Sequence, residues 1–236
     1  METSPETGVA PDSTRAPQTS PRRWIGYVIP MAVYLALTAL EGDKGIGIPY
    51  PWLYLFKIVV VTAILVVCRR VWSDIRFEAR VLPAAILVGL AVFVEWVLLD
   101  KFLPYPHLGS RVGFNPWSSI PDSGTRLLFL VSRFYGLVLV VPLMEELFWR
   151  SFVLRWLTDQ NFTAVPMGAF SWSAFWWVAA GFGFEHPEWL AAVLCAIAYG
   201  LLLRQTKSLY ACIVAHAVTN LALGIYVVQF QAWRFW

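Results

Sequence analysis

The sequence predicts an all-α protein, a polytopic helical bundle embedded in a membrane with about seven to eight transmembrane helices. Of its 236 residues, 58% are hydrophobic and only 14% are charged, and the mean hydropathy is +0.61. Soluble domains contain about 45–50% apolar and about 25% charged residues, so the composition excludes an ordinary water-soluble globule. The three cysteines lie in apolar runs without paired spacing, which argues against a disulfide framework.

Residues 1–21 are rich in Ser, Thr and Pro and predict a disordered cytoplasmic tail, not a secretory signal. Seven apolar runs then approach the roughly 20 residues that a helix needs to cross a bilayer. The runs cover residues 24–41, 52–69, 82–100, 127–149, 164–185, 189–204 and 208–231. The fourth run is able to continue to residue 157, and the sixth is short.

The predicted organisation is the tail, then N-terminal transmembrane helices with an external loop over 22–126, then a second group of helices over 127–236. Residues 101–126 form the longest loop, in which prolines and glycines oppose a regular helix. A loop of this length is often a lid or a binding segment. An interfacial connector anchored by Tyr105 and Trp117 is an equally good interpretation. No internal repeat is visible, which argues against a transporter built from inverted repeats.

The basic residues predict the orientation. Of the 18 Lys and Arg residues, Lys57 and Arg133 lie within spans. Five lie on the side opposite the N-terminus: Lys44, Lys101, Arg111, Arg126 and Arg234. The remaining eleven (18 − 2 − 5) lie on the N-terminal side. The positive-inside rule therefore places the N-terminus in the cytoplasm and the protein in the cell (inner) membrane, and we expect no nucleic-acid partner.

Ionisable side chains inside a bilayer are costly and mark functional sites by default. Lys57 lies near a span end and is expected to reach the interface with its ammonium group. Glu95 and Arg133 are expected to pair across helices. Glu185 and Glu188 lie at a membrane edge and are expected to be solvated.

The adjacent acids Glu145 and Glu146 are harder to explain by packing. Neighbouring residues on a helix point about 100° apart, so the two carboxylates are expected to have different partners. Arg150 follows Glu146 by four residues and lies on the same face, which favours an ion pair. Glu145 would then face another helix. A carboxylate partly removed from water holds a proton more readily, which suits a general base near neutral pH.

Two later segments carry polar groups of a matching kind. Phe182 precedes His186 by one turn and is expected to pack beneath the imidazole, and Pro187 ends the helix there. His216 and Asn220 lie four residues apart on one face and present N–H groups that suit an oxyanion. Alone, each polar group is better explained as hydrogen bonding between helices. Their joint occurrence on three helices favours a site.

The ordered segments Glu145-Glu146-Leu-Phe-Trp-Arg150, Phe182-Gly-Phe-Glu-His186 and His216-Ala-Val-Thr-Asn220 resemble the motifs EExxxR, FxxxH and HxxxN. These motifs mark the CPBP family of intramembrane proteases, which includes type II CAAX proteases and bacteriocin-processing enzymes. The resemblance covers about residues 127–231. It implies a CPBP-like catalytic core over 127–236 that hydrolyses a peptide bond near the C-terminus of a membrane-associated or lipid-modified protein.

The resemblance also implies a role for each residue. Glu145 with His186 would activate water, Glu146 with Arg150 would hold the helix and the charge balance, and His216 with Asn220 would stabilise the oxyanion. No HExxH spacing is present, so we expect a metal-free reaction. If zinc is used, its ligands would be Glu145, His186 and His216.

The first half, with its Gly-Ser-Arg-Val-Gly-Phe-Asn-Pro-Trp loop, is similar to a bacterial branch associated with exosortase-type sorting. The substrate would then be a transmembrane tail and not a prenylated CAAX end. Two other hypotheses stay open. One is a non-catalytic immunity or scaffold protein that binds a peptide in the same cavity. The other is a proton-coupled transporter that uses Glu95, Glu145 and Arg133. The sequence does not indicate an oligomeric state.

Overall fold

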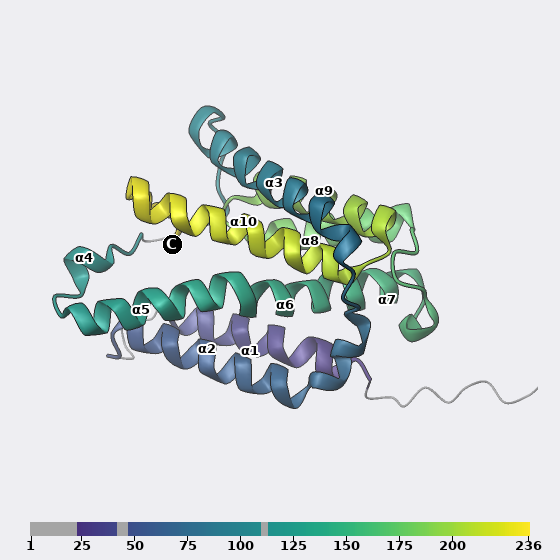
Figure 1. Cartoon of the computed structure of the whole chain (residues 1–236), viewed down its shortest axis with the longest axis horizontal. Coiled ribbons are helices and arrows are strands. Elements are labelled where there is room, and N and C mark those ends of the chain that lie inside the picture. Colours follow the sequence, from purple (N-terminus) through teal and green to yellow (C-terminus); the bar gives the residue numbers. More distant parts are fainter. Residues whose placement is uncertain (1–22, 42–46, 110–112) are drawn as a thin grey trace, which may run out of the picture.

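A computed structural model describes residues 23–41, 47–109 and 113–236 (Figure 1). The tail expected at residues 1–21 lies outside the described residues. Long helices dominate the fold, and no strand occurs in the part of the chain that is described. Six of these helices are α1 (Ile25–Glu41), α2 (Tyr50–Val67), α3 (Leu82–Phe102), α8 (Trp172–Phe184), α9 (Trp189–Thr206) and α10 (Leu209–Phe230). The all-α, polytopic class predicted from composition is confirmed.

The fourth predicted run is the longest helix of the protein. It is continuous over Ser123–Thr158, which at about 1.5 Å per residue corresponds to about 54 Å. The predicted extension beyond residue 149 is therefore present. Two π-helical segments interrupt the α-helical hydrogen bonding along this length. Its segments are α5 (Ser123–Tyr135), η4 (Gly136–Val140), α6 (Val141–Glu146), η5 (Leu147–Val153) and α7 (Leu154–Thr158).

The fifth predicted run differs from the structure. Only α8, with 13 residues, is regular helix there, and about 20 Å of rise is less than the roughly 30 Å of a hydrocarbon core. The residues before α8 are irregular. They include Pro166 and also Gly168, whose φ is 73°. Among the described residues, five helices are long and apolar enough to cross a membrane, and α1 is slightly shorter.

Short elements connect the helices. The turn from α2 to α3 contains the 3₁₀ segments η2 (Arg69–Asp74) and η3 (Ala79–Val81). The long loop, expected to lack regular helix, contains the single turn α4 (Pro116–Ser119), which Asn115 caps by accepting from Trp117 N at 3.0 Å. Two further 3₁₀ segments are η6 (Phe162–Ala164) and η7 (Trp233–Phe235).

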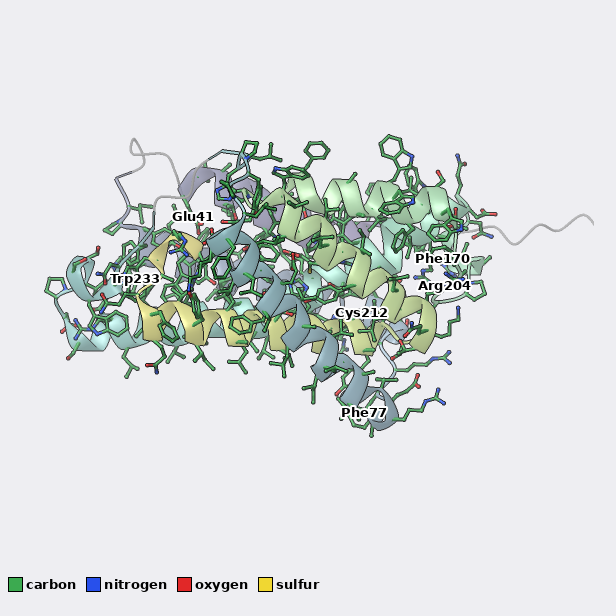
Figure 2. The ribbon with its side chains drawn as sticks, turned by 90° about the horizontal axis from the view of Figure 1, so that it is seen from above. Glu41, Phe77, Phe170, Arg204, Cys212 and Trp233 are labelled. Atoms are coloured by element: carbon green, nitrogen blue, oxygen red, sulfur yellow. The ribbon has the colours of Figure 1, made fainter. Side chains whose placement is uncertain are left out.

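The long helix separates two groups of helices, with α1 and α2 on one side and α3, α8, α9 and α10 on the other (Figure 1). Glu41 and Trp233 lie at one end of the bundle, and Phe170 and Arg204 lie at the other (Figure 2). Large apolar side chains cover the outer surface, including Trp177 at 67% and Phe184 at 76% exposure. Such a surface is stable in lipid and not in water, so the chain is an integral membrane protein.

Close contact between α3 and α10 brings the first half of the chain against the last helix. A Cβ added at Gly89 would lie 2.4 Å from the backbone oxygen of Ala215. Thr219 Oγ1 donates to the Gly89 carbonyl at 2.7 Å, and Tyr199 Oη of α9 donates to Thr219 Oγ1 at 2.7 Å. Glycine at position 89 therefore allows α3 and α10 to pack closely, and this packing holds α10 and its polar residues in place.

Candidate active site

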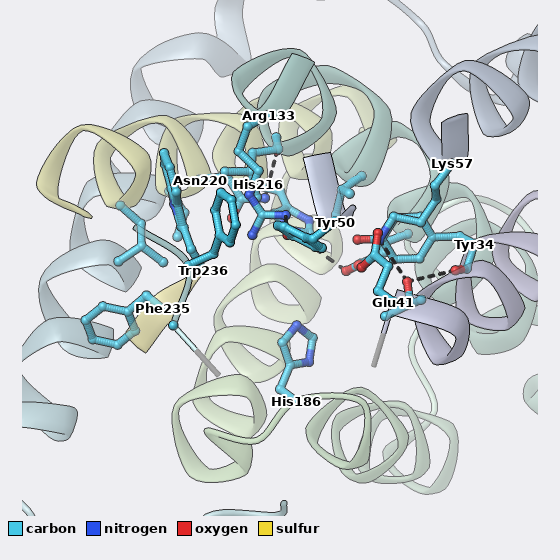
Figure 3. A pocket seen from close by; sticks show the side chains of 18 of the residues that line it. Tyr34, Glu41, Tyr50, Lys57, Arg133, His186, His216, Asn220, Phe235 and Trp236 are labelled. Atoms are coloured by element: carbon cyan, nitrogen blue, oxygen red, sulfur yellow. Dashed lines mark hydrogen bonds and ion pairs between the residues drawn. The ribbon is translucent and has the colours of Figure 1, made fainter. Parts of the chain in front are cut away.

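A cavity of about 780 Å³ lies inside the bundle between the two groups of helices. Glu145, His186, His216 and Asn220, which lie on three separate segments, all line it. Figure 3 shows His186 reaching into the cavity from the side opposite Arg133, Tyr50 and Lys57. The structure thus brings four of the predicted site residues to one cavity. The other two predicted residues, Glu146 and Arg150, lie behind its wall.

The irregular turns of the long helix position the wall that carries Glu145. In η4 the Val141 N–H bonds to the Gly136 carbonyl, five residues earlier. In the same register the Leu137 carbonyl would require an N–H from Pro142, and proline has none. Asn220 Nδ2 donates to that carbonyl at 2.9 Å. The proline therefore creates the acceptor that orients the Asn220 amide, and the second N–H of the same amide group is available to a ligand.

Behind the cavity wall, Glu146 accepts two hydrogen bonds at one oxygen. Arg150 Nη1 donates to Glu146 Oε1 at 3.0 Å, and His216 Nδ1 lies 2.9 Å from the same oxygen. Glu146 is fully buried, and Arg150 and His216 are 1% and 5% exposed. The ion pair expected from the four-residue spacing is present. Glu146 additionally joins the long helix to α10, a contact that the sequence did not indicate.

Aromatic rings surround the guanidinium of Arg150. Its Cζ atom lies 4.6 Å from the Phe182 ring centre and 5.4 Å from that of Tyr199. Cation–π contacts of this kind stabilise a cation that is removed from water. Arg150 therefore connects the long helix to α8 and α9 as well as neutralising Glu146.

His186 lies at the end of α8, where its ring is held by its own helix. The ring centres of Phe182 and His186 are 4.8 Å apart and tilted by 30°, as expected from their spacing. His186 Nδ1 lies 2.9 Å from the Phe182 carbonyl oxygen. The long loop packs against this end of the helix, since Leu108 N donates to the Pro187 carbonyl at 2.9 Å. The loop is thus part of the site's surroundings.

Hydrogen bonding defines which nitrogen of each histidine carries hydrogen. A carbonyl oxygen only accepts, so His186 Nδ1 donates, and Nε2 of the neutral ring is an acceptor. In the same way His216 Nδ1 donates to the Glu146 carboxylate. His216 Nε2 lies 3.9 Å from Glu145 Oε2. It becomes a donor only when the ring is doubly protonated. His186 suits a base, and His216 suits an oxyanion donor in its cationic form.

The described side chains around the cavity do not form a zinc-binding group. Among the described residues, no three His, Cys, Asp or Glu side chains are grouped closely enough to hold a metal ion. Glu145, His186 and His216 line the same cavity without forming such a group. The residues do not fit a zinc site in this conformation, and no step below depends on a metal.

Several polar residues differ from their expected surroundings. Lys57 is 1% exposed and pairs with Glu41 at 2.8 Å, so its ammonium group is buried within the bundle. Glu188 is 5% exposed, so it is not solvated. Glu185 accepts from Trp149 Nε1 at 2.8 Å.

The expected ion pair between Glu95 and Arg133 is absent. Both Glu95 carboxylate oxygens are buried without a hydrogen-bond partner among the described residues. Arg133 Nη1 donates to Tyr50 Oη at 3.3 Å. The sequence favoured a structural pairing for Arg133 and gave it a functional role only in the transporter hypothesis, although a cation within an apolar run is a signal of function. The structure places Arg133 in the cavity wall.

Comparison with known proteins matches one region of the chain to a protein family. Residues 127–222 match the family model described as Rce1-like, type II CAAX prenyl endopeptidase. The match includes all six residues of the predicted site. Neither a curated protein nor a solved structure matches the chain.

Proposed function

Residues 127–222 form an Rce1-like domain of the type II CAAX prenyl endopeptidase (CPBP) family, and from this premise we propose that the chain hydrolyses a peptide bond within the membrane. The substrate is the C-terminal part of a membrane-associated or lipid-modified protein. The observation that carries the proposal is the shared cavity, which Glu145, His186, His216 and Asn220 all line.

In the proposed reaction Glu145 and His186 remove a proton from a water molecule, whose oxygen adds to the scissile carbonyl carbon. His216 in its cationic form and the second Asn220 N–H donate to the resulting oxyanion. The C–N bond then breaks, and the proton held by the base passes to the departing amine. Glu146 and Arg150 do not touch the substrate, and they position the His216 ring and the long helix.

The size and surroundings of the cavity support a membrane-bound substrate. A volume of about 780 Å³ is in the range of ligand pockets, about 300–1,000 Å³, and it admits a short extended segment but no folded domain. Apolar surface surrounds the bundle, which suits a substrate that a lipid or a transmembrane anchor holds beside it in the bilayer.

The test is cleavage of a set of reporters with different C-terminal membrane anchors, expressed in cells together with the chain. Removing a general base typically lowers the rate by about 10²–10⁴-fold, so Glu145→Gln and His186→Ala are expected to abolish visible processing. Glu95→Gln is the matched control, because Glu95 is also a buried carboxylate inside a span but does not line the cavity. Processing by Glu145→Gln at the wild-type level would favour the non-catalytic binding protein instead.

A further inference from the structure

Arg133 of α5 is a buried cation in the cavity wall for which the proposed reaction has no use. It is 9% exposed and lines the same cavity as Glu145 and His216. Its guanidinium Cζ lies 4.7 Å from the Tyr54 ring centre and 5.6 Å from that of Trp236. Nη1 donates to a neutral phenol oxygen, and Nε is buried without a hydrogen-bond partner.

No carboxylate of the described residues lies within ion-pair distance of Arg133. Glu41 also lines the cavity, but its carboxylate pairs with Lys57 Nζ at 2.8 Å. A buried charge without a counter-ion is costly inside a bilayer. The cost is offset when an anion enters the cavity and pairs with the guanidinium.

We propose that Arg133 binds the free C-terminal carboxylate of the peptide segment that occupies the cavity, which rests on the proposed function. A guanidinium presents a planar set of N–H groups that matches a carboxylate with two parallel hydrogen bonds. Trp236, whose ring centre lies 5.6 Å from the Arg133 guanidinium, lines the same cavity (Figure 3). Asn220 also lines it and bonds the Leu137 carbonyl, which lies on the long helix between Arg133 and Glu145. A segment whose end reaches Arg133 therefore passes the oxyanion donors.

The helix that carries both groups sets the length of this segment. Arg133 precedes Glu145 by twelve residues, which corresponds to about 18 Å along the axis. An extended chain advances about 3.3–3.6 Å per residue, so roughly five extended residues span this axial distance. Both side chains reach into the cavity, which shortens the distance to about three to five residues.

A lipid phosphate is the competing anion, since arginine pairs with it equally well. Arg133 lies ten residues, or about 15 Å, inside the long helix, which favours a peptide end over a headgroup at the membrane surface. The test therefore separates the two sources by comparing nanodiscs of neutral phosphatidylcholine with nanodiscs that contain phosphatidylglycerol.

The first arm measures binding and requires no hydrolysis. The probes are two pools of N-palmitoylated hexapeptides with five randomised C-terminal positions, one of free acids and one of C-terminal amides. The full-length chain in phosphatidylcholine nanodiscs is expected to retain the free acids about tenfold or more over the amides. Arg133→Gln is expected to remove this preference. Arg126→Gln, an Arg→Gln change on the same helix outside the cavity, is expected to keep it.

The second arm measures cleavage of both pools by mass spectrometry, with products expected to lack three to five C-terminal residues. Binding with the acid preference but without cleavage would end the proposed function and leave the Arg133 site standing. Cleavage of acids and amides at equal rates would end the Arg133 proposal and leave the hydrolase standing. Failure to bind either pool, or a preference that survives Arg133→Gln, would also overturn the proposal. So would an acid preference that anionic lipid abolishes, because it would identify a headgroup phosphate as the natural partner.

A stability measurement separates ligand binding from a structural role. If Arg133 only supported the fold, Arg133→Gln would lower the melting temperature. Because the substitution removes a buried charge that has no ion-pair partner among the described residues, we expect the melting temperature of the ligand-free variant to equal or exceed that of the wild type. The stabilisation produced by adding the acid pool is expected to disappear in the same variant.

Discussion

Substitution of Arg150, whose guanidinium lies behind the cavity wall, tests whether Glu146 is held as a buried ion. In Arg150→Met the fully buried Glu146 carboxylate keeps only its His216 contact. Breaking a buried ion pair by removing one partner costs about 3–5 kcal/mol. Since His216 remains beside Glu146, we expect the lower end of that range, about 3 kcal/mol. The variant also loses the contact of the guanidinium with the Phe182 ring at 4.6 Å.

The assay is thermal unfolding in detergent. A change of about 3 kcal/mol corresponds to roughly 6–12 °C for a chain of this size. The double variant Glu146→Gln/Arg150→Met removes both charges and is expected to recover at least half of that loss. Arg204→Met removes an exposed arginine that contacts a ring and, among the described residues, no acid, and is expected to melt within about 2 °C of the wild type. The reasoning fails if Arg150→Met melts like the wild type, or if the double variant melts below both single variants.

Three further outcomes follow from the packing and from the donor set. Gly89→Ala is expected to push α3 away from the backbone of Ala215 and to lower the free energy of unfolding by roughly 1–3 kcal/mol. The control is Gly124→Ala, whose added Cβ would meet its nearest atom at 3.4 Å, and it is expected to melt like the wild type. Phe182→Leu is expected to lower kcat more than it changes KM, because the ring beneath His186 is lost while the cavity surface stays apolar; equal changes in both parameters would contradict this. Cleavage is expected to withstand treatment with a chelator, and loss of activity that zinc alone restores would disprove the metal-free reaction.

Hydropathy predicted the helices that face lipid, and it did so to within a few residues for α2, α3, α9 and α10. It failed over residues 164–185, because an apolar composition does not require a helix. Pro166 and Gly168 there permit an irregular, still apolar segment before α8 begins. Hydropathy measures the preference for lipid, and the regular backbone depends on capping and turn residues that contribute little to it.

Spacing along one helix predicted the pairing of Glu146 with Arg150 and of Phe182 with His186, since helix geometry alone brings these residues together. Contacts between helices were not predictable in this way. The pairing of Lys57 with Glu41 and the contact of Arg133 with tyrosines in place of Glu95 depend on the rotation of each helix about its axis. That rotation results from the packing of the whole bundle.

The most direct test of the central claim is the source of the oxygen in the product. The full-length chain is incubated with the free-acid peptide pool in water enriched in oxygen-18, and the masses of the shortened peptides are measured by mass spectrometry. Hydrolysis at the cavity predicts one oxygen-18 atom in the new carboxylate and no product from Glu145→Gln. Unlabelled product, or labelled product formed equally fast by Glu145→Gln, would contradict the claim that Glu145 activates water in this cavity.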